Sequence, residues 1–223
     1  MSGFSKSTIA FLKGLGADNS KAWFDAHRSE YDAHYIVPAK TFIEQVAGPL
    51  GAIAPNVQAE PRVNGSIFRI NRDIRFSKDK TPYKDHLDLW FWEGDRKTAL
   101  SSFFFRLTAG TLILGVGNHG LDKHRLEAFR AAVIDAGTGR QLADIANTLE
   151  ADRFTIGGDH YARVPRGFVA QDAAAERFLK YNALWVSRET AHPKELYGDE
   201  FVNFCVERWR LMAPLHHWLM ALA

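Results

Sequence analysis

Residues 99–117, ALSSFFFRLTAGTLILGVG, predict two β-strands joined by a tight turn at Ala109 and Gly110. A connection this short favours antiparallel pairing, because parallel strands need a crossover of a dozen or more residues. Just before them, residues 86–94, HLDLWFWEG, predict a further strand. An antiparallel sheet is therefore expected in the middle of the chain.

The sequence on either side of this sheet has a helical period. Aromatic residues recur at every fourth position from Trp23 to Tyr35, and residues 199–223 carry an apolar helical face with Pro214 inside it. Residues 153–188 mix weak strand signals with one helical stretch. We therefore expect an α+β fold in a single domain, residues 1–223. Its mainly antiparallel sheet should cover about residues 57–117, with later short strands, and should pack against N- and C-terminal helices.

The composition is that of an ordinary soluble globular protein. Of 223 residues, 46% are hydrophobic and 24% are charged, and the formal net charge is only +2. No stretch approaches the roughly 18 apolar residues of a membrane-spanning helix, and no secretory signal is visible. We expect a cytoplasmic protein without a membrane partner. The single cysteine, Cys205, excludes an internal disulfide, and its apolar helical surroundings favour a place in the core.

Positive charge is concentrated in residues 68–84, FRINRDIRFSKDKTPYK. Residues 66–76 also alternate in polarity like a half-buried strand, with one face of Phe and Ile side chains and one polar face. Six basic residues of the segment, counted against Asp73 and Asp79, give it a charge of +4 and leave −2 for the rest of the chain; they are Arg69, Arg72, Arg75, Lys78, Lys80 and Lys84.

Arg72 falls on the apolar face of this expected strand, where a guanidinium needs a partner because its desolvation costs several kcal/mol. Two interpretations remain open. Arg72 can form a structural ion pair with Asp73, Asp88 or Glu93, or its planar fork can be oriented toward a phosphate or carboxylate, which arginine binds through two parallel hydrogen bonds.

Arg69 and Arg75 fall on the polar face together with Asn71 and Asp73, where successive side chains are roughly 6.5 to 7 Å apart along a strand, and this face can hold a polyanion between the two forks. The following turn can bring further groups over the strand end, namely Lys78, Lys80, Lys84 and the ring and hydroxyl of Tyr83. We therefore predict a site for a small phosphate- or carboxylate-bearing ligand at this segment. Asp73 is the candidate acid or base if the protein is an enzyme, which the sequence leaves undecided.

Five features together resemble the DUF2461 family over nearly the whole chain. They are NSKAWFDAHRSEY at residues 19–31, the basic segment at 68–84, a hairpin ending in GVG at 115–117, RVPRGF at 163–168, and a C-terminal helix containing proline. The basic segment is the most specific of them. The resemblance implies a single domain of unassigned activity, and it transfers no catalytic residue.

Other functions have weaker support. The dinucleotide-binding motif G-x-G-x-x-G is matched by Gly115, Gly117 and Gly120, and Asp135 follows twenty residues after Gly115. However, the strand before this motif belongs to a hairpin and not to a βαβ unit. The histidines lack an established metal-ligand spacing, so no metal site is predicted, and no cofactor is identified.

Two rival interpretations of the basic segment remain. In the first, the protein is a non-catalytic scaffold whose arginines form an internal ion-pair network. In the second, aromatic and basic residues bind single-stranded nucleic acid, which the low net charge disfavours without excluding it. The oligomeric state cannot be predicted.

Overall fold

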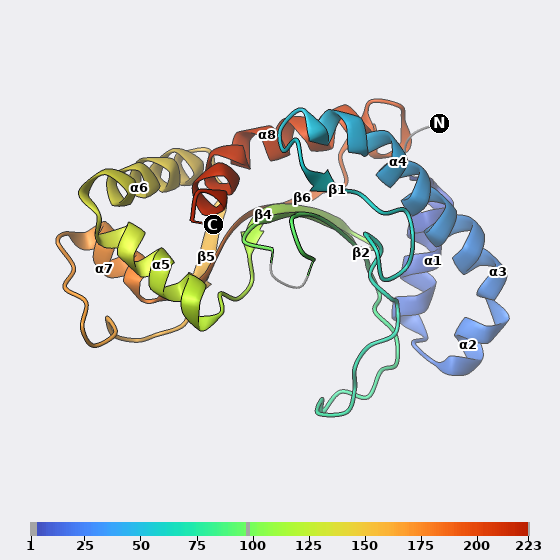
Figure 1. The fold of residues 1–223 in the computed structure, drawn as a ribbon. Coiled ribbons are helices and arrows are strands. Elements are labelled where there is room, and N and C mark those ends of the chain that lie inside the picture. Colours follow the sequence, from blue (N-terminus) through green and yellow to red (C-terminus); the bar gives the residue numbers. More distant parts are fainter. Residues whose placement is uncertain (1–3, 97–98, 223) are drawn as a thin grey trace. The chain divides into compact units, whose positions relative to one another are not determined.

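The computed structural model describes residues 4–96 and 99–222, and it confirms an α+β fold with a mainly antiparallel sheet (Figure 1). The strands are β1 (Val57–Gln58), β2 (Leu87–Glu93), β3 (Ser102–Leu107), β4 (Thr111–Asn118), β5 (Thr155–Asp159) and β6 (Tyr181–Ala191). They are ordered β1-β2-β3-β4-β6-β5. The predicted hairpin is confirmed, since β3 and β4 are neighbours joined at Thr108 and Thr111.

Helices precede β1 and follow β6 in the sequence, as predicted, and further helices lie between β4 and β6. They are α1 (Lys6–Ala17), α2 (Lys21–Ala26), α3 (Arg28–Tyr31), a π-helical turn η1 (Asp32–Ile36), α4 (Val37–Gly51), α5 (Lys123–Ile134), α6 (Ala136–Ala151), α7 (Ala173–Leu179), a 3₁₀ turn η2 (Lys194–Tyr197) and α8 (Phe201–Met220). No helix among the described residues is long and apolar enough to cross a membrane.

The chain's internal contacts group it into two compact units. The first contains residues 4–92, 104–114 and 189–208, and the second contains the rest of the described residues. Each unit therefore takes several separate segments of the chain, and β2, β3, β4, β6 and α8 contribute residues to both.

The first unit has an aromatic core. The Phe4 ring lies 5.7 Å from the rings of both Phe42 and Phe105, and Phe201 packs 5.6 Å from Phe42. All four side chains are almost completely buried. Since rings at these separations add to ordinary apolar burial, the segment before α1 is held to α4, β3 and α8 here by residues distant in sequence.

The segment that alternates in polarity, residues 66–76, forms no regular strand, so that prediction is wrong. It is the first half of a projecting loop between β1 and β2 (Figure 1), whose residues 69–84 we call the arm. Two backbone hydrogen bonds close the arm's base, from Arg72 N to the Pro82 carbonyl at 2.9 Å and from Lys84 N to the Ile70 carbonyl at 2.8 Å. The arm is thus an irregular hairpin.

An offset in pairing explains why no strand forms. Isolated antiparallel bridges join Ile67 to Leu89 and Asn71 to Tyr83. Asn71 follows Ile67 by four positions, whereas Leu89 follows Tyr83 by six, so the second side carries two extra residues. This bulge lies around Asp85 and His86, and the Tyr35 hydroxyl donates to the His86 carbonyl at 3.2 Å. Bulges of this kind redirect side chains.

The glycines of the second unit have a packing role. Gly117 has φ +131°, and a Cβ there would lie 2.3 Å from the Leu184 carbonyl oxygen of β6. Gly115 likewise packs against Val186 and Ser187. Close approach of β4 to β6 therefore explains this motif without a dinucleotide, and Asp135 caps α6 by accepting from Gly137 and Thr138.

Candidate functional site

Some of the charged residues of the arm line two separate hollows in the first unit. The arm hollow, about 640 Å³, is lined by Gly16, Asn19, Arg72, Asp73, Asp79, Thr81, Tyr83, Lys84, Asp85 and His86. The helix hollow, about 420 Å³, is lined by Phe24, Asp25, Arg28, Tyr31, Asp32, Ile36, Lys40, Arg62, Val63, Arg69, Ile70, Asn71 and Tyr83. Tyr83 borders both, so the predicted single cradle is divided at this residue.

Tyr83 is fixed in place by α2 and by the turn before it. Its ring stacks on Phe24 with centroids 4.3 Å apart. The side chain of Asn19 accepts from the Tyr83 amide at 3.0 Å and donates to its carbonyl at 2.9 Å. Because both backbone groups and the ring are held, Tyr83 forms a firm wall between the two hollows.

Arg72 is paired, as the sequence predicted, but its partner is none of the three carboxylates expected. Its Nη1 lies 2.6 Å from Asp79 Oδ2 and also donates to the Thr81 carbonyl and hydroxyl. Asp79 accepts from Thr81 as well, and these bonds, led by that from the Thr81 amide, lower the pKa of Asp79 to about 2. Arg72 therefore braces the arm's own turn.

Arg75 and Asp73 also pair within the arm. The Arg75 guanidinium donates to both Asp73 carboxylate oxygens, at 3.0 and 2.7 Å. These hydrogen bonds lower the pKa of Asp73, so this carboxyl is an ionised acceptor at neutral pH. Arg75 lines neither hollow, and Asp73 borders only the arm hollow.

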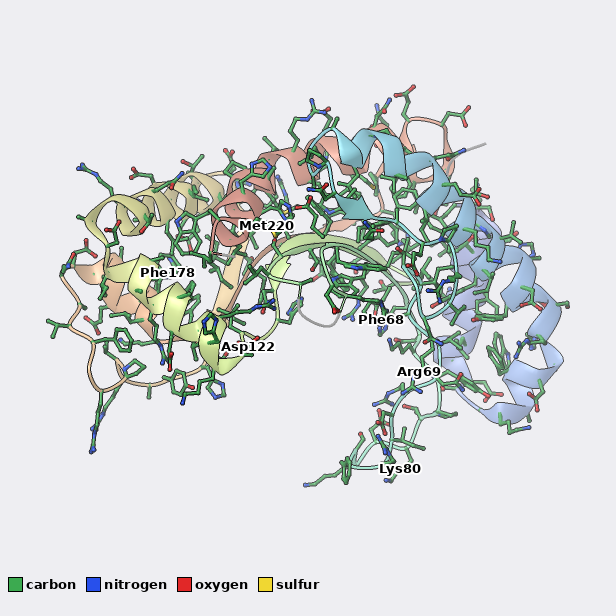
Figure 2. All side chains as sticks on the ribbon, in the orientation of Figure 1. Phe68, Arg69, Lys80, Asp122, Phe178 and Met220 are labelled. Atoms are coloured by element: carbon green, nitrogen blue, oxygen red, sulfur yellow. The ribbon has the colours of Figure 1, made fainter. Side chains whose placement is uncertain are left out.

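The lysines of the arm are spread along it. Lys80 lies at its far end (Figure 2) and donates to the Ile74 carbonyl at 2.8 Å. Lys78 is exposed and makes no hydrogen bond or ion pair within residues 4–96 and 99–222. Only Lys84, near the base, reaches a hollow, where its Nζ lies 4.8 Å from the Phe68 ring centroid.

A buried carboxylate that the sequence did not single out as a site lies beside the bulge. Asp88, with 5% of its side chain exposed, receives two hydrogen bonds from Arg106, at 2.7 and 3.1 Å. His86 Nε2 lies 3.3 Å and Lys84 Nζ 3.6 Å from its Oδ2. Burial raises the pKa of Asp88, but hydrogen bonds from His86 and Arg106 outweigh it and bring the pKa to about 2. The available signal was Arg106, an arginine inside the apolar run SSFFFRL.

The helix hollow has an excess of positive charge. Four of its side chains are basic and two are acidic; the basic ones are Arg28, Lys40, Arg62 and Arg69. Asp25 is bound by Lys21 at 2.7 Å, and Asp32 lies 3.9 Å from Arg28. Within the described part of the chain, Arg69 and Lys40 make no hydrogen bond or ion pair. Figure 2 shows Arg69 near the base of the arm.

A second polar cluster is enclosed in the other unit. His216 of α8 lies 2.9 Å from the Ser101 hydroxyl through Nδ1 and 2.8 Å from Glu93 Oε2 through Nε2. All three residues are buried, and burial lowers the pKa of His216. A neutral imidazole satisfies this geometry, with Nε2–H donating to Glu93 and Nδ1 accepting from Ser101. Since none of the three faces solvent, we interpret the cluster as structural.

No group of three or more His, Cys, Asp or Glu side chains in the described ranges could hold a metal ion. The family described as "Conserved hypothetical protein (DUF2461)" matches residues 7–218. No curated protein matches the chain.

Proposed function

Because the chain belongs to the DUF2461 family, whose description names no activity, we propose from geometry alone that this is a cytoplasmic protein that binds a small phosphate- or carboxylate-bearing molecule in the helix hollow. Arg69 carries the proposal. It is an arginine at a hollow with two more cations than anions, and its guanidinium has no hydrogen-bonding partner among the residues described. An arginine fork matches the two oxygens of a phosphate or carboxylate.

Three further groups support the same hollow. Lys40 of α4 also lacks an ion-pair partner within the described ranges, Arg28 lies over the rings of Phe24 and Tyr31, and Arg62 follows β1. They reach the hollow from separate segments. Arg62 pairs with Glu60 and Arg28 lies 3.9 Å from Asp32, so, among the described residues, Lys40 and Arg69 are the cations left for an anion. The volume of about 420 Å³ is within the range of small-molecule sites.

The arm hollow is a poorer anion site. Its two cations, Arg72 and Lys84, already face Asp79 and Asp88, and three aspartates line it. An anion there would meet more negative than positive charge. We therefore assign ligand binding to Arg69 and Tyr83 of the predicted set, and we assign the paired Arg72 and Arg75 to the arm's own structure.

A thermal-shift screen of nucleotides, sugar phosphates and organic acids tests the proposal, followed by calorimetry on any hit. A ligand at 100 times its dissociation constant stabilises by about 2.7 kcal/mol. Arg69→Ala should weaken the hit by roughly 10- to 100-fold, since a charge-assisted hydrogen bond contributes about 1.5 to 3 kcal/mol. Arg75→Ala removes the same charge outside the hollow and should leave the affinity unchanged. No hit, or equal affinities in both variants, would refute the proposal.

A further inference from the structure

The end of the arm exposes an apolar side chain among cations. Phe76 is 95% exposed, although a phenyl ring is normally buried. The Arg75 guanidinium lies 5.8 Å from its centroid, and Lys78 and Lys80 follow. Residues 72–80 carry four basic and two acidic side chains, a balance of +2. An exposed phenyl ring next to basic side chains is suited to a partly apolar pocket that is lined by acidic side chains.

Hydrogen bonds and ion pairs within the arm hold this tip away from the rest of the unit. Asp79 accepts from Arg72 and Thr81, Asp73 accepts from Arg75, and Lys80 donates to the Ile74 carbonyl. All of these bonds are internal to the arm. A braced loop loses less conformational freedom on binding than a flexible one, which favours docking.

A hollow with the complementary character lies elsewhere in the same unit, where η2 leads into α8. This α8 hollow, about 570 Å³, contains the partly exposed ring of Phe204, with the Arg208 guanidinium 3.5 Å from its centroid. Four acidic and two basic side chains line it, a balance of −2; the acidic ones are Glu195, Asp199, Glu200 and Glu207.

We propose that the arm tip of one copy of this protein docks into the α8 hollow of a second copy. Phe76 then packs against Phe204 and the Arg208 guanidinium that lies over its ring, and Lys78 and Lys80 face the acidic side chains of the hollow. The charge balances, +2 and −2, are opposite, and both partners are surfaces of the described first unit. Within one chain the two do not meet, because Phe76 is 95% exposed.

A second copy fits this surface better than other partners do. The arm's own aspartates already pair with Arg72 and Arg75, so few cations remain for nucleic-acid phosphates. One phenyl ring is also a small anchor for a lipid surface. The contact joins two different patches, and such heterologous contacts build rings or open chains in place of a two-fold dimer.

Sedimentation velocity of the purified chain from low to high micromolar concentration tests this directly. We expect species larger than a monomer at the higher concentrations, with association weakening as salt is raised. Phe76→Ser should abolish association. A monomer at every concentration overturns the proposal, as does binding of the arm to oligonucleotides or anionic vesicles that Phe76→Ser removes while association persists.

Charge reversal provides a sharper test. Lys78→Glu alone and Glu195→Lys alone should each raise the dissociation constant by at least about tenfold, since like charges then face each other. An equal mixture of the two variants should regain association, because each arm can find a hollow of opposite charge. Lys13→Glu makes the same charge change on α1 and should associate like the unmodified chain. Failure of the mixture to recover, with both variants folded, overturns the proposal.

Discussion

Two Asp–Arg pairs in the first unit differ in their burial. Comparing them shows how burial changes what an ion pair contributes to stability. Asp88 pairs with Arg106 beside the bulge, and Asp79 pairs with Arg72 in the arm. Both carboxyls have a pKa of about 2. However, 5% of the Asp88 side chain is exposed, compared with 60% for Asp79. Equal pKa values therefore arise from different balances of forces.

Around Asp88, strong hydrogen bonds overcome a large cost of burial, and both partners lose water when the protein folds. Around Asp79, hydrogen bonds act on a carboxylate that keeps its hydration, and solvent screens the pair. The buried pair should therefore influence global stability strongly, and the arm pair should influence only the arm.

The largest expected effect comes from removing one partner of the buried pair. Arg106→Ala leaves the Asp88 carboxylate buried, and stranding a buried charge costs roughly 3 to 5 kcal/mol. The lower end of this range is expected here, because Lys84 and His86 remain within 3.6 Å. Urea unfolding followed by circular dichroism measures the loss.

Arg75→Ala is the matched control, since it also removes an arginine bound to an aspartate, but on the exposed arm. Its unfolding midpoint should stay close to that of the unmodified protein. If Arg106→Ala and Arg75→Ala shift the midpoint equally, the distinction between buried and exposed pairs is refuted.

The next largest effect should come from lowering the pH, to which the stabilising contributions of Asp88 and Asp79 should respond differently. The folded-state pKa of Asp88, about 2, lies below the ordinary 3.8, so the unfolded chain takes up the proton first. The stabilisation is complete above the unfolded pKa and is lost as pH falls from about 5 to 2. It amounts to roughly 2 to 3 kcal/mol, since one pKa unit corresponds to about 1.4 kcal/mol. Unfolding free energies measured from pH 6 to 2 should show this slope.

Asp88→Asn should flatten that slope, and Asp79→Asn should change it much less, although the two carboxyls have similar pKa values. The reason is that Thr81 and Arg72, the partners of Asp79, are near it in the chain, so part of its lowered pKa persists in the unfolded chain and does not contribute to the slope. A profile that flattens equally in both variants would show that burial does not distinguish them.

The buried cluster of the second unit extends the comparison to a neutral imidazole, that of His216. Ser101→Ala removes the hydroxyl that lies 2.9 Å from His216 Nδ1 and leaves a buried acceptor without its partner. Such a loss costs roughly 1 to 3 kcal/mol. Urea unfolding measures it, with Ser29→Ala at an exposed helical position as the control. Equal stabilities of the two variants would contradict the neutral-histidine assignment.

Local patterns were enough to predict the regular elements. Strand β2 and the β3–β4 hairpin follow from short apolar runs with one tight turn, which report local geometry. Residues 68–75 also alternate in burial as predicted, although they form no strand. The alternation reflects extended backbone, whereas a regular ladder also needs a constant register. The two extra residues around Asp85 and His86 break that register, and no property of residues 66–76 signals them.

The site was predictable only in part. Arg72 needed a partner and has one, but it is Asp79, seven positions along the same arm, because the turn folds back on itself. The helix hollow was missed, since Lys40, Arg62 and Arg69 come from a helix, a loop and the arm. Their convergence depends on tertiary packing, which a pattern within one segment cannot reveal.

The smallest effect on stability should come from Arg72, the arginine that the sequence placed on the apolar face of an expected strand. Arg72→Ala removes an ion pair whose carboxylate is 60% exposed, so we expect a loss of about 1 kcal/mol or less in urea unfolding. Its consequence should be local, because Arg72 ties Asp79 and Thr81 together at the arm's turn. Amide hydrogen exchange should accelerate within residues 72–82 and stay unchanged in β2 and β3. A loss of 3 kcal/mol or more would place Arg72 with Arg106, as part of the network that holds the sheet.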